Sequence, residues 1–228
     1  MAMRMSSSRP EFNPVRVGLD FDNTIASYDE LMFDTAVGWG LIDAGLKRNK
    51  KIVRDQLRSL PDGESHWRRL QTYAYGECMA QARPMDGVLD FLCFCRAKSI
   101  PIWIVSHQTE YNNFGPPTVN LRQAAMRWLA EQGFFNEAIT GLNPARVFFE
   151  TTREEKVARI ATLEVSHFVD DLEETFLEPT FPSDVGKIHY VSHGEASSVP
   201  GALHATTWPA ILAHIQAIAL GQSGTDSE

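Results

Sequence analysis

The stretch that decides the fold is VRVGLDFDNTI, residues 15–25. From Val15 to Leu19 apolar residues alternate with others, which predicts a β-strand. The strand runs into two carboxylates, Asp20 and Asp22, and residues two apart on a strand point to the same side. Like charges about 4 Å apart repel by roughly 4 kcal/mol at an effective dielectric constant near 20. The pair therefore indicates a bound cation, a shared proton or a chemical task, although two structural N-caps would give the same pattern.

The composition limits the class of protein. With 228 residues, 43% hydrophobic and 22% charged, the chain has the composition of a soluble globular protein, and we expect one domain with an insertion. A net charge of −8 argues against general nucleic-acid binding, which requires a basic face. No run of about 18 apolar residues predicts a membrane span. We therefore expect neither a nucleic acid nor a membrane as partner, and a monomer or a homodimer.

The cysteines and the chain ends carry no signal for export. The three cysteines have no metal-binding or redox spacing, and an odd count fits no disulfide framework, which favours reduced thiols. Residues 1–13 contain no apolar segment typical of a signal peptide. We expect a cytoplasmic protein whose ends, residues 1–11 and 221–228, are disordered.

Residues 26–83 predict helices and no strand. We expect one helix from Leu31 to near Gly45, a second over 49–60 and a third over 65–82. Between Lys47 and Arg69 this segment has eight basic and three acidic residues, a local charge of +5. The charge fits either a solvated helix face or a basic surface turned toward an anionic substrate.

After residue 85, strands and helices alternate, which predicts a parallel sheet covered on both faces. The apolar run 100–105 is typical of a central strand of such a sheet. The other elements that we expect are strands over 146–149, 167–169 and 187–191, and helices over 86–97, 118–132, from the capping box at 151–155 onward, and over 208–220. The fold class is therefore α/β, with a Rossmann-like core and a small helical insertion after the first strand.

Polar residues stand where several of these strands end. Asp20 and Asp22 end the first strand, Ser106 follows the strand over 100–105, and Asp170-Asp171 follow the strand over 167–169. Lys156 lies on the helix before the last of these strands. Because ligands of open α/β sheets bind at the carboxyl ends of the strands, we expect these residues to form one site.

This order of motifs resembles the haloacid dehalogenase-like superfamily of phosphohydrolases. The resemblance covers residues 15–191, and its most specific motif is Asp20-Phe21-Asp22-Asn23-Thr24 in its strand context. It implies a core of residues 12–27 and 85–220 and a helical cap of residues 28–84. It also implies that Asp20 is the nucleophile that takes the phosphoryl group, while Asp22 is a general acid and then a general base.

The resemblance also implies a cofactor and a substrate class. Mg²⁺ would be held by Asp20, Asp170 and the backbone carbonyl of Asp22, with Asp171 tuning or joining its ligands. Ser106 and Lys156 would bind the phosphoryl group of a small phosphorylated metabolite, and His107, Arg68 and Arg69 are candidate substrate contacts. A lone histidine such as His107 is more often structural.

Of the alternative functions, one fits these motifs well and three fit them less well. A phosphotransferase such as a sugar-phosphate mutase shares the core chemistry. A dehalogenase or phosphonate hydrolase typically lacks an acid at the position of Asp22. A receiver-type phosphoacceptor places its paired acids before the phosphorylated aspartate, which is the wrong order here, and a non-catalytic binding protein would be expected to have lost one of the motifs.

Overall fold

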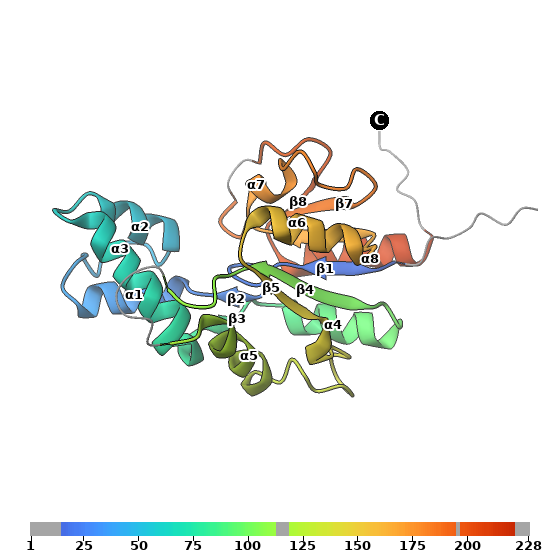
Figure 1. Cartoon of the computed structure of the whole chain (residues 1–228), viewed down its shortest axis with the longest axis horizontal. Coiled ribbons are helices and arrows are strands. Elements are labelled where there is room, and N and C mark those ends of the chain that lie inside the picture. The colour runs from blue at the N-terminus through green and yellow to red at the C-terminus, as the bar shows by residue number, and fades with distance from the viewer. Residues whose placement is uncertain (1–14, 113–118, 195–196, 222–228) are drawn as a thin grey trace, which may run out of the picture.

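The computed structural model describes residues 15–112, 119–194 and 197–221, and its centre is a six-stranded parallel sheet (Figure 1). The strand order is β5-β4-β1-β6-β7-β8, and every neighbouring pair is parallel. The strands are β1 (Val17–Leu19), β4 (Ile102–His107), β5 (Val147–Glu150), β6 (His167–Asp170), β7 (Gly186–Tyr190) and β8 (Leu203–Ala205). This sheet confirms the predicted α/β fold class. The tails predicted to be disordered lie outside the described residues, apart from Gly221.

Helices cover both faces of the sheet and enclose two apolar cores. Figure 1 shows α6 on one side of the sheet and α4 and α5 on the other. Along β4, Ile104 packs into the core with α4, α5 and α8, and Val105 packs into the core with α6 and α7. No helix in the described part of the chain is long and apolar enough to cross a bilayer. These helices are α4 (Val88–Ala97), α5 (Leu121–Glu131), α6 (Arg153–Thr162), α7 (Glu173–Phe176) and α8 (Trp208–Ala219).

Close packing at the centre of the sheet explains the glycine in β1. Gly18 pairs in register with Phe168 of β6, and a Cβ atom on Gly18 would lie 2.5 Å from Cδ2 of Phe168. Any side chain at this position would therefore displace the ring from the core with α6. The glycine therefore lets β1, the strand that leads to Asp20, pack closely against the ring of Phe168.

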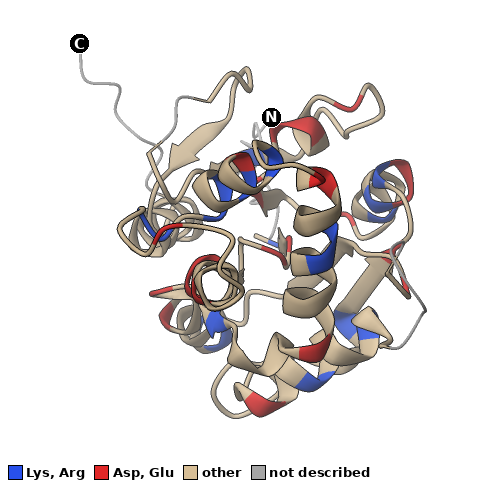
Figure 2. Cartoon of the chain, turned by 90° about the vertical axis from the view of Figure 1, so that its left-hand side faces the viewer, with Lys and Arg blue, Asp and Glu red and all other residues tan. Residues whose placement is uncertain are grey.

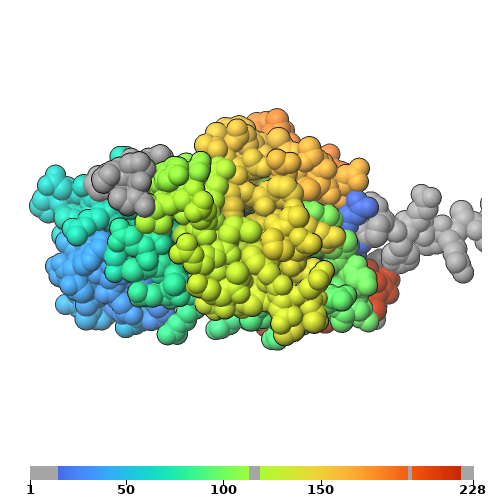
Figure 3. Space-filling view, turned by 60° about the horizontal axis from the view of Figure 1, so that its bottom comes forward, coloured from blue at the N-terminus to red at the C-terminus, as the bar shows by residue number. Residues whose placement is uncertain are grey.

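A block of helices lies beyond the end of β1, at one end of the molecule (Figures 1 and 3). We call residues 29–81 the helical block. It consists of α1 (Asp29–Gly38), α2 (Lys50–Arg58), α3 (Gly63–Thr72), the π-helical turn η1 (Tyr73–Glu77) and the 3₁₀ turn η2 (Met79–Gln81). In the space-filling view the block lies against the surface of α5.

The prediction of no strand between residues 26 and 83 was wrong. The short strands β2 (Ala26–Ser27) and β3 (Arg83–Pro84) pair antiparallel and close the base of the helical block. Two-residue strands are too short to show a period of two, so pattern analysis does not detect them. The three-residue strand β8 was not predicted for the same reason.

Two predicted helices in the block end earlier than expected. The first stops at Gly38 because Gly40 takes a left-handed conformation (φ +70°), and the amide of Leu41 donates to the carbonyl of Ala36 at 3.0 Å. The third changes at Tyr73 from α-helix to a π-helical turn. Such turns often mark functional sites, and this one brings Tyr75 toward the end of β1.

Candidate active site

The chain turns sharply after β1, and the turn sets the positions of the two carboxylates. Asp20 is the first residue past the strand, and its amide donates to the carbonyl of Val169 at 2.8 Å. Asn23 takes a left-handed conformation (φ +59°), which asparagine tolerates better than most residues, and its amide donates to the carbonyl of Ala26 at 2.8 Å. The turn therefore keeps Asp20 against the sheet and carries Asp22 toward the helical block.

A buried lysine joins the ends of two strands. The ammonium of Lys156, on α6, donates to Oδ1 of Asp20 and to Oδ2 of Asp170, both at 2.6 Å. All three side chains are buried, with exposed fractions of 2%, 6% and 0%. A capping box between Thr152 and Glu155 fixes the start of the helix, so that Lys156 enters the site from a defined direction. The predicted meeting of Lys156 with the strand ends is found in the structure.

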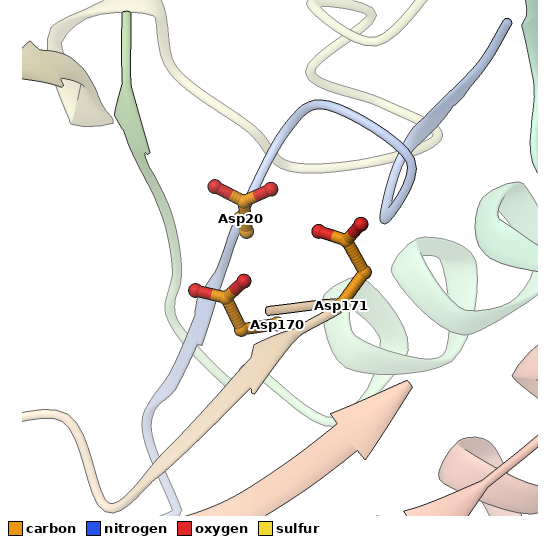
Figure 4. Close-up of side chains that lie close together, drawn as sticks. All are labelled: Asp20, Asp170 and Asp171. Carbon is orange, nitrogen blue, oxygen red and sulfur yellow. The ribbon is translucent and has the colours of Figure 1, made fainter. Parts of the chain in front are cut away.

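Three carboxylates gather at this point (Figure 4). One oxygen each of Asp20, Asp170 and Asp171 lies within 4.8 Å of the others. The amide of Leu172 donates to Oδ1 of Asp170 at 2.9 Å, and Nε2 of His189 lies 3.1 Å from the carbonyl oxygen of Asp171. The side chain of Asp170 and the backbone of Asp171 are therefore each held by a hydrogen bond.

The electrostatics of this cluster favour a cation. Burial raises the pKa of Asp20 to about 7, against the opposing effect of Lys156, and the charge of Asp170 raises it further. Burial, and then the charges of Asp20 and Asp170, raise the pKa of Asp171 well above its usual range. When ionised, three carboxylates and one ammonium carry a net charge of −2. Hard oxygen donors with this charge fit a divalent ion such as Mg²⁺.

The predicted ligand set needs one distinction. Asp20, Asp170 and Asp171 supply the clustered carboxylate oxygens, whereas the carboxylate of Asp22 is not part of this group. This is compatible with the expected use of its backbone carbonyl, which leaves the side chain for proton transfer. Asp22 and Asp20 therefore have different surroundings although they are two residues apart.

Asp22 is held by a tyrosine that the sequence analysis did not identify. The buried hydroxyl of Tyr28 donates to Oδ1 of Asp22 at 2.5 Å, and its ring packs edge-on against Tyr75 with centroids 4.7 Å apart. Burial raises the pKa of Asp22, and the hydrogen bond from Tyr28 partly offsets this effect. A neutral phenol thus holds Asp22, whereas a cation holds Asp20. Nothing in the spacing of residues 22 and 28 signals this contact.

The predicted phosphate and substrate contacts lie in different places. Ser106 is buried near the end of β4, two residues beyond Ile104, which pairs with Leu19 of β1. Nε2 of exposed His107 lies 2.9 Å from the carbonyl oxygen of Thr151.

The two predicted arginines also differ from each other. Arg68 lines a cavity beside Asp22 and forms a 3.3 Å ion pair with Glu64. Arg69 instead stacks on the ring of Trp39, with its guanidinium 4.5 Å from the centroid, and does not line this cavity. Only Arg68 therefore keeps a position from which a substrate is reachable.

Two cavities adjoin the site. One, of about 230 Å³, is lined by charged side chains that include Lys50, Asp171 and His193. Burial disfavours the charged form of Lys50, but Tyr75, Asp171 and Asp22 together raise its pKa. The other cavity, of about 420 Å³, is lined by Asp22, Arg68, Tyr75, His107 and Gln108, among others. Asp22 therefore faces the second cavity.

Comparisons with known proteins extend the structural result. No family model matches the sequence, and no curated protein matches it. Among solved structures, the chain is similar to a HAD family hydrolase from Deinococcus radiodurans R1 with bound phosphate and sodium (15% identity, TM-score 0.55, covering 92% of this chain and 97% of that one). A HAD-superfamily hydrolase of subfamily IA from Geobacter sulfurreducens PCA is also similar (13%, 0.55, 89% and 96%).

A third similar structure is a dehalogenase with an intermediate complex (9% identity, TM-score 0.51, covering 88% of this chain and 96% of that one). The fold of this chain is therefore that of the haloacid dehalogenase-like hydrolases, as the sequence motifs predict. Since this fold carries dehalogenases as well as other hydrolases, the reaction must be argued from the side chains themselves.

Proposed function

We propose that this protein is a Mg²⁺-dependent phosphohydrolase that acts on a small phosphorylated metabolite through a phosphorylated Asp20. The observation that carries the proposal is the contrast between two neighbouring carboxylates. Asp20 is paired with buried Lys156 at 2.6 Å, and Asp22 accepts a hydrogen bond from Tyr28 at 2.5 Å. Environments that separate two carboxylates in this way suit one as a nucleophile and the other as an acid.

The roles of the chain's own residues follow from these contacts. An oxygen of Asp20 attacks phosphorus, and the bond from phosphorus to the leaving oxygen breaks as Asp22 gives that oxygen its proton. Asp22 then takes a proton from the water that attacks the phosphoryl group on Asp20, which releases inorganic phosphate. Lys156 stabilises the charge of the phosphoryl oxygens, and Ser106 donates its hydroxyl hydrogen to one of them.

The acidic cluster supports a metal in this proposal. Asp20, Asp170 and Asp171 would hold the ion, together with the backbone carbonyl of Asp22. When bound, Mg²⁺ would supply positive charge opposite the phosphoryl oxygens.

Asp22 favours phosphate esters over haloacids as substrates. A halide leaves as a stable anion and needs no proton, whereas an alkoxide leaving group does. Asp22 carries a raised pKa and faces the larger cavity, which suits it to protonate such a group. A phosphotransferase remains the second candidate because the same steps end in transfer when a sugar hydroxyl replaces water.

We also propose that residues 28–84 act as a cap over a core of residues 12–27 and 85–220. The larger cavity supports this division because Asp22 lines it from the end of β1, whereas Arg68 and Tyr75 line it from the helical block. The paired strands β2 and β3 would form the two connections of the cap.

Hydrolysis of p-nitrophenyl phosphate tests the proposal. We expect turnover with Mg²⁺, its loss with EDTA, and loss of at least about 10³-fold in Asp20→Asn, because the nucleophile is removed. Asp22→Asn should also lose turnover but accumulate phosphate on Asp20, detectable by intact mass. Asp34→Asn, an exposed carboxylate of the helical block, is the matched control. Equal activity in wild type and Asp20→Asn, or halide release from a 2-haloacid as the only activity, would refute the phosphohydrolase.

A further inference from the structure

Gln108 is a buried amide without a partner. It lies directly after β4, its exposed fraction is only 5%, and neither its Oε1 nor its Nε2 has a hydrogen bond in the described part of the chain. Buried amides are nearly always hydrogen-bonded, because an unpaired buried donor or acceptor destabilises the fold. Gln108 also lines the 420 Å³ cavity into which Asp22 faces. An unpaired amide at this place points to a ligand.

The backbone of Gln108 is held from two sides. Its amide donates to the carbonyl of Glu150 at 2.8 Å, which continues the pairing of β4 with β5. Its carbonyl accepts from Nε of Arg122 at 2.9 Å, and Nη2 of Arg122 donates to Oγ1 of Thr151 at 2.9 Å. The side-chain amide is therefore presented to the cavity from a fixed backbone.

Among the described residues, the lining of this cavity is polar and mostly uncharged. Besides Gln108 it includes the neutral side chains of Gln71, Thr72 and Thr109. Its basic side chain Arg68 is exposed and paired with Glu64. The smaller cavity, in contrast, is lined by Lys50, Lys51 and Arg54. If the substrate had a second anionic group besides its phosphoryl group, that group would meet more positive charge in the smaller cavity than beside Asp22.

We infer that Gln108 binds the leaving group of the substrate, and that this group is rich in hydroxyls, of the sugar or polyol type. The inference rests on the proposed function, because Asp22 marks the leaving-group side only if it acts as the acid. A hydroxyl both donates and accepts, so it satisfies Oε1 and Nε2 together, whereas a carboxylate or phosphate only accepts. A volume of about 420 Å³ suits a small metabolite.

The test compares substrates and variants. Phosphates of neutral sugars and polyols (glucose 6-phosphate, sorbitol 6-phosphate, glycerol 3-phosphate) are compared with 3-phosphoglycerate, phosphoserine and p-nitrophenyl phosphate. We expect the best hydroxyl-rich substrate to exceed both charged ones at least about tenfold in kcat/KM. Leucine is similar in size to glutamine but lacks the amide. Gln108→Leu should therefore lower kcat/KM for the best hydroxyl-rich substrate about 10- to 100-fold, and change kcat/KM for p-nitrophenyl phosphate less than about threefold.

Controls separate recognition from structure. The exposed Gln123→Leu on α5 should change neither rate. The melting temperature of Gln108→Leu should stay equal or rise, because the substitution removes an unpaired buried amide. Equal losses on all substrates, or a preference for a charged leaving group, would overturn the inference. Turnover of p-nitrophenyl phosphate without a preference for any hydroxyl-rich substrate would also overturn the inference. The absence of turnover of every phosphate ester would instead refute the proposed function itself.

Discussion

At two places in the described part of the chain, at the strand ends and in the helical block, one cation lies between two carboxylates. Lys156 contacts its two aspartates at 2.6 Å each, and Arg48 contacts its two partners at 2.5 and 2.7 Å. The distances are nearly equal, but the side chain of Lys156 is 2% exposed and that of Arg48 is 45% exposed. Burial, and not distance, therefore decides what each cluster does. The partners of Arg48 are Glu30 and Asp34.

The same distinction explains the basic segment of the sequence. Figure 2, which looks onto the helical block, shows acidic and basic residues alternating along its helices. Arg54 pairs with Asp55, Arg58 and Arg68 share Glu64, and Arg48 pairs with Glu30 and Asp34 from outside the segment. At least half of the eight basic side chains are therefore paired at the surface. Exposed pairs of this kind contribute little to stability. The predicted basic surface is therefore a solvated face in part, and Lys50 is a basic residue of the block that turns toward the strand ends.

The largest difference is expected between Lys156→Met and Arg48→Met. Loss of Lys156 leaves two buried carboxylates without their cation, so kcat/KM for p-nitrophenyl phosphate should fall at least about 10²-fold. The free energy of unfolding at pH 8 in EDTA should fall by about 3–5 kcal/mol, measured by urea denaturation. Arg48→Met should leave both quantities unchanged within error. Similar effects of the two substitutions would contradict the role of burial.

A smaller effect is expected from Tyr28→Phe, which removes only the hydrogen bond to Asp22. We expect kcat to fall about tenfold because Asp22 loses the group that orients it. The hydroxyl of Tyr28 lowers the pKa of Asp22, so its removal should raise that pKa and move the alkaline limb of kcat/KM to higher pH. Tyr111→Phe, at an exposed tyrosine, should leave the profile unchanged. A shift of the limb to lower pH would disprove the assignment of Asp22 as the acid.

A still smaller effect is expected from the two adjacent arginines of α3, whose substitutions should affect KM differently. Arg68→Ala removes a positive charge from the edge of the larger cavity, and we expect KM to rise about two- to fivefold with kcat unchanged. Arg69→Ala should leave KM unchanged and slightly lower the melting temperature, because it removes the contact with Trp39. Steady-state kinetics and thermal unfolding of both variants check this. An equal rise in KM would show that both face the substrate.

The smallest effect concerns His167, at the start of β6 and far from the carboxyl ends of the strands. Burial lowers the pKa of His167 below its usual 6.5, and His214 adds to the effect. The unfolded chain therefore binds this proton first as the pH falls, and stability is lost below about pH 6.5. The free energy of unfolding of His167→Gln should fall less between pH 7 and 5 than that of wild type, with exposed His204→Gln as control. An unchanged slope would refute this contribution.

Much of the site was accessible from sequence because parallel strands end at one edge of their sheet. This rule alone placed Asp20, Ser106 and Asp170 near one another, and the helix before β6 added Lys156. Local signals also identified the capping box of α6 and a helix over residues 49–60. These features depend on residues close in sequence, where spacing is informative.

What could not be predicted depends on contacts between distant parts of the chain or on elements without a pattern. The Lys156–Asp20 pair joins residues 136 positions apart, and its two 2.6 Å contacts exist only in the folded chain. The π-helical turn that brings Tyr75 to the cavity interrupts a helix that the sequence pattern predicts to run through residue 82. Gln108 looks like any loop residue until its burial without a partner is known.

By itself, the sequence determined which chemical groups stand at the ends of the strands and in which order along the chain. Only the tertiary structure decided their surroundings: a cation beside Asp20, a phenol beside Asp22 and an unpaired amide across the cavity from the block. The physical reason is that composition and spacing specify charge and local geometry. The pKa of a carboxylate and the contribution of an ion pair to stability depend instead on burial. Burial is a property of the whole fold.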